Sequence, residues 1–195
     1  MVLHAADTPE DRLPRPVIRP YPSEQVTNAI LADGTSFTFR PIRPEDEPLL
    51  VRFHETLSER SVYLRYLEHL KLNQRVAHQR LARMCFIDYD REVALVAEAH
   101  DGTDTRVLAA VGRLVRARDR EQAEFALLVA DPYQGRGLGL ALLRHLVAVG
   151  GGEGIRRITA EISPENGAMQ AVCRKLGFRL TGAPGDPTVR ALLEL

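Results

Sequence analysis

The chain contains stretches in which every second residue is apolar and others in which apolar residues recur every three or four positions. The first pattern predicts β-strands and the second predicts amphipathic helices. Strands are predicted at 36–40, 92–98, 107–115, 122–129, 157–162, 178–181 and 189–195. Helices are predicted at 43–57, from 58 onward, and at 72–84, 138–149 and 166–176. Early antiparallel hairpins followed by a strand, helix, strand unit imply an α/β (α+β) fold, with a mixed, largely antiparallel sheet of about seven strands flanked by helices.

Proline is frequent at the beginning of the chain, where apolar residues are few. Residues 1–23 are therefore predicted to form an extended linker or an arm on a surface. Residues 24–195 are predicted to form one folded domain. An N-terminal segment so unlike a folded domain suggests that the domain after it was cut from, or once joined to, another protein segment upstream.

The composition is that of an ordinary soluble globular protein, with 45% hydrophobic and 27% charged residues among 195. A formal net charge of zero at pH 7 argues against sequence-independent binding of nucleic acid. No apolar run reaches membrane-spanning length, and two widely separated cysteines indicate a reducing, cytoplasmic location. The histidines are scattered without the spacing of metal ligands, so no metal site is predicted.

A glycine-rich stretch lies between the predicted strand at 122–129 and the predicted helix at 138–149. Its glycines allow successive backbone N–H groups to face one concavity, with the helix N-terminus behind them. Such a turn is typical of phosphate binding, although glycine is also selected for the shape of a turn alone. The spacing excludes the dinucleotide fingerprint, which needs glycine at Leu140 or Leu142, and the Walker loop, which needs Gly-Lys-Ser/Thr. The remaining pattern is Gln134-x-x-Gly137-x-Gly139.

This pattern resembles the coenzyme A pyrophosphate loop of the GNAT acetyltransferase superfamily. A narrower resemblance, to the acetyltransferase domain of bacterial protein lysine acetyltransferases (Pat-type), covers roughly 19–195 and rests on motifs upstream of the loop. These motifs are Arg19-Pro-Tyr-Pro22, Asp33-Gly34, Arg40-Pro-Ile-Arg-Pro-Glu-Asp-Glu-Pro48, His54-Glu-Thr-Leu-Ser58 and Tyr63-Leu-Arg-Tyr66. The resemblance implies acetyl-CoA as cosubstrate, held by the loop and by the backbone of the preceding strand. The residues implied in this binding are Leu127, Leu128, Val129, Gln134, Gly135, Arg136, Gly137, Leu138, Gly139 and Asn166.

Glu124 is the candidate general base. Period two places it on the same strand face as Ala126 and Leu128, and an acid inside an apolar strand is costly unless it is solvated or paired. A protonated lysine, with a pKa of about 10.4, must lose a proton before it attacks a thioester. The resemblance implies that a glutamate on this strand accepts that proton, often through a water. The alternative is a structural salt bridge to Arg113 or Arg116.

Other residues have two interpretations each. Glu98 and Glu161 compete with Glu124 as bases, or are solvated or paired charges. Asn166 begins the last predicted helix as an N-cap, and the resemblance also implies a contact with the pantetheine arm. Many GNAT enzymes have a tyrosine seven residues later that protonates the departing thiolate, where this chain has Cys173. The thiol either acts as a general acid or fills the core as a small apolar residue.

The sequence predicts transfer of acetyl from acetyl-CoA to an amine by direct attack in a ternary complex, because neither cysteine has a visible histidine partner for a covalent intermediate. The resemblance implies that the amine is a lysine side chain in a protein such as an acyl-CoA synthetase. It also implies an upstream acyl-CoA-synthetase-like domain in a longer parent chain. A small-molecule amine N-acetyltransferase and a non-catalytic acyl-CoA-binding sensor domain are the alternatives.

Overall fold

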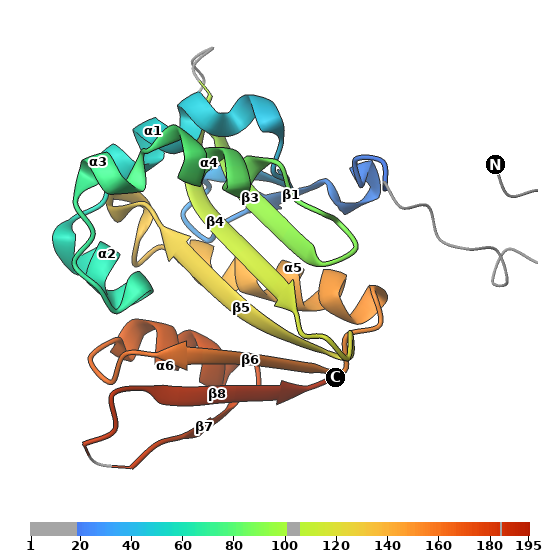
Figure 1. Cartoon of the computed structure of the whole chain (residues 1–195), viewed down its shortest axis with the longest axis vertical. Helices are drawn as coiled ribbons and strands as arrows, with labels where there is room; N and C mark the ends of the chain where they lie inside the picture. The colour runs from blue at the N-terminus through green and yellow to red at the C-terminus, as the bar shows by residue number, and fades with distance from the viewer. Residues whose placement is uncertain (1–18, 101–105, 184) are drawn as a thin grey trace, which may run out of the picture.

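The computed structural model describes residues 19–100, 106–183 and 185–195, which form one eight-stranded sheet (Figure 1). The strand order is β1-β2-β3-β4-β5-β6-β8-β7. Neighbouring strands are antiparallel except β5 and β6, which are parallel. The strands are β1 (Thr27–Ile30), β2 (Ser36–Pro41), β3 (Glu92–His100), β4 (Val107–Arg116), β5 (Gln122–Val129), β6 (Arg157–Ile162), β7 (Arg179–Thr181) and β8 (Val189–Glu194). The predicted mixed, mostly antiparallel fold is confirmed.

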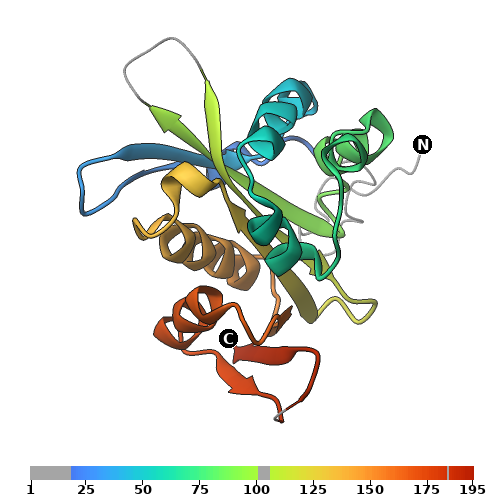
Figure 2. The ribbon, with the colours of Figure 1, turned by 90° about the vertical axis from the view of Figure 1, so that its left-hand side faces the viewer.

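Helices cover both faces of the sheet (Figure 2). One face carries α1 (Glu47–Glu55), α2 (Glu59–Tyr66), α3 (Leu72–Arg75) and α4 (His78–Cys85), and the other carries α5 (Leu138–Gly152) and α6 (Gly167–Lys175). Leu142 and Leu146 of α5 pack with Leu114 of β4 in one hydrophobic cluster. Leu50 of α1 and Leu81 of α4 belong to a second cluster on the opposite face. Among the described residues, no helix is long and apolar enough to cross a membrane.

Two elements differ from the prediction. Strand β1 makes the sheet one strand larger than the predicted seven, and its residues are mostly exposed, with Ile30 77% exposed, so it lacks an apolar face that a pattern could reveal. The predicted helix at 72–84 is two helices, because the backbone of Ala77 is extended (φ −57°, ψ 128°). Next to this break, the buried Arg75 donates from Nη1 to the carbonyl of His54 (2.9 Å), a tertiary contact that helical spacing does not encode.

The Pro-rich arm predicted at 1–23 lies mostly outside the described residues. In its described part, Arg19 Nη1 pairs with Glu153 Oε2 (2.8 Å), and the hydroxyl of Tyr21 donates to the carbonyl of Pro41 (3.1 Å). The short 3-10 helix η2 (Ser23–Gln25) then leads into β1. The end of the arm therefore lies against the folded domain.

Strands β5 and β6 pair over only part of their length. Their parallel pairing runs from Gln122 with Arg157 to Glu124 with Thr159. Strand β5 stays paired with β4 as far as Val129, so its second half has no recorded partner on the β6 side. In Figure 1 the two strands separate toward their arrowheads. This separation creates an open strand edge in the middle of the sheet.

A buried ion network ties β2 and β3 to the beginning of α1. Arg40 is 4% exposed and Asp46 is 0% exposed. They are joined by two hydrogen bonds, from Nη1 to Oδ2 (2.7 Å) and from Nη2 to Oδ1 (2.8 Å), and Arg40 also pairs with Glu98 Oε2 (2.7 Å). Burial by itself lowers the pKa of Arg40, but the hydrogen bonds and charges of Asp46 and Glu98 outweigh it and raise the pKa. The guanidinium therefore stays charged inside the protein.

Candidate active site

The glycine-rich stretch forms a turn between β5 and α5. The 3-10 helix η4 (Asp131–Tyr133) leads into Gln134, and Gly135 (φ 73°) and Gly137 (φ 89°) then adopt left-handed backbone. Helix α5 begins at Leu138, so the N–H groups of its first turn have no intrahelical acceptors. The turn therefore presents backbone donors and a positive helix end, which together favour a phosphate group.

The side chain of Gln134 attaches this loop to α2. Its Nε2 lies 3.0 Å from each of three acceptors: Ser61 Oγ, the carbonyl of Val129 and Asp131 Oδ1. Asp131 in turn accepts from Ser61 Oγ (2.7 Å) and from the backbone N–H of Ser58 (3.2 Å), the N-cap of α2. Gln134 therefore orients the loop through its side chain, while its backbone N–H donates to the carbonyl of Asp131 (3.2 Å).

The second half of β5 presents free backbone groups toward the gap. Ala130 donates its N–H to the carbonyl of Ala109 on the β4 side (2.8 Å). Because backbone groups alternate between the two edges of a strand, the N–H and C=O of Leu127 and the N–H of Val129 face the β6 side, whereas the carbonyl of Val129 accepts from Gln134 Nε2. Beyond Thr159, β6 contributes no recorded pair to them. An extended, amide-containing ligand can therefore bind β5 as an added strand does.

A cavity of about 380 Å³ connects the open strand edge with the glycine turn. Most of the residues predicted to bind the cofactor line it: Leu127, Leu128, Val129, Gln134, Gly135, Gly137, Gly139 and Asn166. The remaining walls come from Tyr133 of η4, Leu140 of α5 and the helices α2 and α6, none of which was predicted as part of the site. These additional lining residues include Ser61, Leu64, Arg65, Ala168, Met169, Ala171, Val172 and Lys175. The helical spacing of the α6 members was a usable signal, because it places them on one helix face.

Arg136 and Leu138 are the two predicted binding residues that do not line the cavity. Arg136 makes an ion pair with Asp33 Oδ2 (2.6 Å) and donates to Thr35 in the turn between β1 and β2. Arg136 can therefore pair with a phosphate only if it releases Asp33. The side chain of Leu138 is buried in the core, so it can serve a ligand only through its backbone N–H.

Asn166 has the predicted N-cap role, and its contact with a pantetheine arm stays a prediction. It is the N-cap of α6, and its Oδ1 accepts from the backbone N–H of Met169 (3.0 Å). It also lines the cavity opposite the open edge of β5. The cap fixes its orientation at the cavity wall.

Glu124 occupies the point at which β5 and β6 separate. It is the last residue of β5 that pairs with β6, and its side chain is exposed. The arginines considered as structural partners are occupied elsewhere: Arg113 pairs with Glu92, and Arg116 pairs with Glu153. In the described part of the chain, no hydrogen bond or ion pair is recorded for Glu124, although it acts electrostatically on Arg65 of α2. The carboxylate is therefore free to accept a proton beside the cavity.

Comparison with known families agrees with this geometry. Residues 36–179 match the family model described as "Acetyltransferase (GNAT) domain". The chain belongs to the GNAT acetyltransferase family. It is an N-acetyltransferase, and GNAT domains use acetyl-CoA as the acetyl donor.

Individual relatives support the same assignment. The crystallised GNAT domain of S. lividans PAT superposes with a TM-score of 0.80 at 32% identity, covering 90% of this chain and 100% of that one. "Acetyltransferase PA5475" of Pseudomonas aeruginosa is 33% identical over 158 residues, 81% of this chain and 83% of the relative. "Acetyltransferase Pat" of Mycolicibacterium smegmatis is 29% identical over 146 residues, 74% of this chain but 41% of the relative.

The competing carboxylates of this GNAT domain lie in different surroundings. Hydrogen bonds from Arg106 and Arg40, helped by their charges, hold the pKa of Glu98 down to about 2. So strongly acidic a group is a poor proton acceptor at neutral pH. Glu161 is exposed on β6, where Thr188 Oγ1 donates to it (3.4 Å).

Cys173 is part of the hydrophobic core. It is 0% exposed and packs in the cluster beneath α5 and α6, while its neighbours Ala171 and Val172 face the cavity. Burial raises the pKa of its thiol to about 11. These features favour the apolar role of Cys173 over that of a general acid for the departing thiolate.

Gly137→Ala is expected to destabilise the domain by about 1 kcal/mol and to weaken acetyl-CoA binding several-fold. Gly137 has a φ of 89°, a conformation that costs an L-residue about 1–2 kcal/mol. Thermal unfolding and calorimetric titration with acetyl-CoA measure the two effects.

Gly139→Ala is the matched control for stability. Gly139 lies within α5, and an added Cβ meets Val129 Cγ2 at 3.5 Å and Leu127 Cδ2 at 3.6 Å, which are ordinary contacts. Alanine in a helix is favoured over glycine by about 1 kcal/mol. A melting temperature lowered equally by both substitutions contradicts the conformational argument.

Proposed function

We propose that this GNAT domain, residues 24–195, transfers acetyl from acetyl-CoA to the side-chain amine of a lysine in a protein, such as an acyl-CoA synthetase. Glu124 acts as the general base. The observation that carries the proposal is the position of this unpaired carboxylate where β5 and β6 separate. The similarity to two relatives named Pat supports a protein acceptor.

The cavity residues divide between the parts of acetyl-CoA. The backbone N–H groups from Gly135 to Gly139 face the diphosphate. The free edge of β5 at Leu127 and Val129 binds the amide groups of the pantetheine arm, and Asn166 faces the same arm from α6. This arrangement directs the thioester toward the point where the strands separate, which brings it to Glu124.

The reaction removes two protons from the lysine ammonium and releases coenzyme A as the leaving group. Glu124 removes a proton from the lysine ammonium, directly or through a water, because only the neutral amine carries a lone pair. The amine nitrogen bonds to the thioester carbonyl carbon, the carbon–sulfur bond breaks, and the electron pair leaves on the coenzyme A sulfur. As the amide forms, the nitrogen loses its second proton, which passes to the coenzyme A thiolate, and the proton held by Glu124 passes to solvent. No protein nucleophile takes part.

Incubation of the protein and acetyl-CoA with a purified acyl-CoA synthetase tests the acceptor. We expect peptide mass spectrometry to find acetyl on a specific lysine, and the adduct to be absent with Glu124→Gln. A small-molecule acceptor predicts instead no adduct on any protein and rapid acetylation of polyamines or amino acids. Acetyl-CoA binding without transfer to either class of acceptor identifies a sensor domain.

A further inference from the structure

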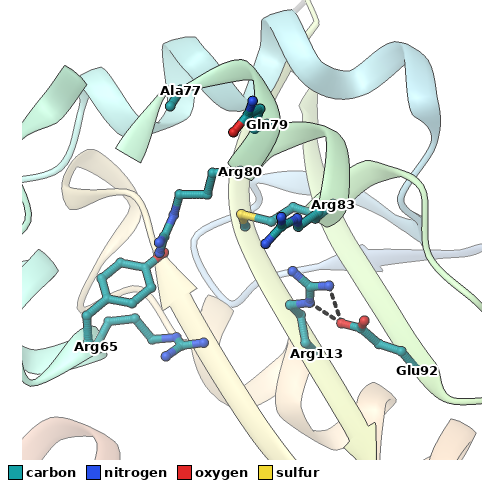
Figure 3. Close-up of a pocket in the computed structure, with 9 residues that line it drawn as sticks. Arg65, Ala77, Gln79, Arg80, Arg83, Glu92 and Arg113 are labelled. Atoms are coloured by element: carbon teal, nitrogen blue, oxygen red, sulfur yellow. Dashed lines mark hydrogen bonds and ion pairs between the residues drawn. The ribbon is translucent and has the colours of Figure 1, made fainter. Parts of the chain in front are cut away.

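A second and larger cavity lies over the sheet between α2 and α4 (Figure 3). Its volume is about 620 Å³. We call it the arginine cleft, because its charged and aromatic walls are Arg65, Tyr66, Arg80, Arg83, Glu92 and Arg113. The whole chain carries 26 basic and 26 acidic residues. The excess of positive charge is therefore a local property of this cleft.

Most of this positive charge has no acidic partner. Arg113 pairs with Glu92 at the floor of the cleft (Figure 3). For Arg65, Arg80 and Arg83, no carboxylate lies within ion-pair distance among the described residues. Burial lowers the pKa of Arg65, and the charges of Arg113 and Arg80 add to this effect, against the opposing influence of Tyr66 and Glu124. Like charges held together in this way favour the binding of an anion.

The positions of two arginines are fixed by the ring of Tyr66. Arg65 Cζ and Arg80 Cζ each lie 4.9 Å from its centroid, within the range of cation–π contacts. The Nε atom of Arg80 is buried and has no recorded hydrogen-bond partner. Arg80 lines the cleft without an acidic partner among the described residues, so a carboxylate that enters the cleft can pair with its guanidinium. The cleft therefore has the geometry of a preorganised oxyanion site.

The arginine cleft adjoins the reaction centre. Arg65 lines both this cleft and the acetyl-CoA cavity, and its charge interacts with Glu124. Glu124 pairs across the ladder with Val115 of β4, so both project from the sheet face that α2 and α4 cover. An acceptor lysine that reaches Glu124 from this face brings its neighbouring residues into the cleft.

We infer that the arginine cleft binds the carboxylates of acidic residues flanking the acceptor lysine, and so selects lysines in acidic segments of protein. This inference rests on the proposed function, because it names the sequence context of that acceptor. Arg65 lies beside the position of the acceptor amine and binds carboxylates next to the lysine. Arg80 and Arg83 of α4 lie farther from the amine and bind carboxylates farther along the acceptor chain.

The test uses two peptides of equal length that contain one lysine each. The flanking residues are Asp and Glu in one peptide and Asn and Gln in the other. We expect wild-type kcat/KM to be about tenfold higher for the acidic peptide, as charge-assisted hydrogen bonds allow. Arg80→Gln and Arg83→Gln are expected to reduce this ratio toward one through KM. Arg144→Gln, an exposed change on α5 at the opposite face, is the control and should retain it.

Salt and direct binding separate the inference from the proposed function. At about 1 M salt, where the Debye length is about 3 Å, the preference should largely disappear. Fluorescence anisotropy of the labelled acidic peptide, which needs no catalysis, should show weaker binding to Arg83→Gln than to Arg144→Gln. Equal kcat/KM for both peptides, or equal binding to the two variants, overturns the inference. If neither a peptide nor a protein is acetylated, but the acidic peptide still binds in a way that depends on Arg83, only the proposed function is overturned.

Discussion

Glu124→Gln is expected to lower kcat at neutral pH by about a hundredfold to ten-thousandfold, the range typical of general-base removal. Glutamine keeps the size and polarity of the side chain but does not accept the proton of the lysine ammonium. The affinity for acetyl-CoA should stay nearly unchanged, since Glu124 does not line that cavity. Steady-state acetylation assays and calorimetric titration with acetyl-CoA measure the two quantities.

The pH profile distinguishes loss of a base from loss of structure. Without Glu124, the enzyme depends on amine that is already neutral, so the rate should rise about tenfold per pH unit below the lysine pKa of about 10.4. Glu161→Gln is the matched control, because it also changes an exposed glutamate in a strand, here β6. Wild-type turnover in Glu124→Gln, or an equal loss in Glu161→Gln, rules out Glu124 as the base.

Asp46→Ala should destabilise the domain by about 3–5 kcal/mol, because it leaves a buried guanidinium with one of its two acidic partners missing. Asp46 is 0% exposed and makes two hydrogen bonds to Arg40. It also accepts from the backbone N–H of Arg43 (2.8 Å), so the substitution removes the anchor of the segment that leads into α1. Chemical denaturation measures the free energy of unfolding.

Asp88→Ala provides the comparison for Asp46→Ala. Asp88 pairs with Arg91 at the surface, where their side chains are 55% and 82% exposed. Exposed pairs contribute about 0–1 kcal/mol. Similar losses from both substitutions show that the ion network around Arg40 has no special role in stability.

The glycine-rich turn illustrates what a contiguous pattern reveals. Strand β5, the glycine turn and α5 follow one another between Gln122 and Gly152, so the period of apolar residues and the glycine spacing describe them completely. The left-handed backbone at Gly135 and Gly137 agrees with that spacing. The same locality explains why Asn166 was recognisable as an N-cap from its place before a helix.

The roles of individual charged side chains were harder to predict from the sequence. Glu98 and Glu124 have similar strand contexts in the sequence, yet Glu98 is held by Arg40 and Arg106 whereas Glu124 has no such partner among the described residues. Which arginine meets which carboxylate depends on strand register and on side chains from other elements. That information is distributed over the whole sheet.

The sequence by itself determined the order of the core elements, the glycine-rich turn and the family to which they belong, because each depends on neighbours within a few residues. Only the tertiary structure decided where β5 leaves β6, which glutamate stays unpaired beside that gap, and how α2 and α4 gather arginines over it. These features join residues from Arg65 to Thr159. Long-range packing of strands and helices brings these residues together, and no local periodicity of the sequence encodes that packing.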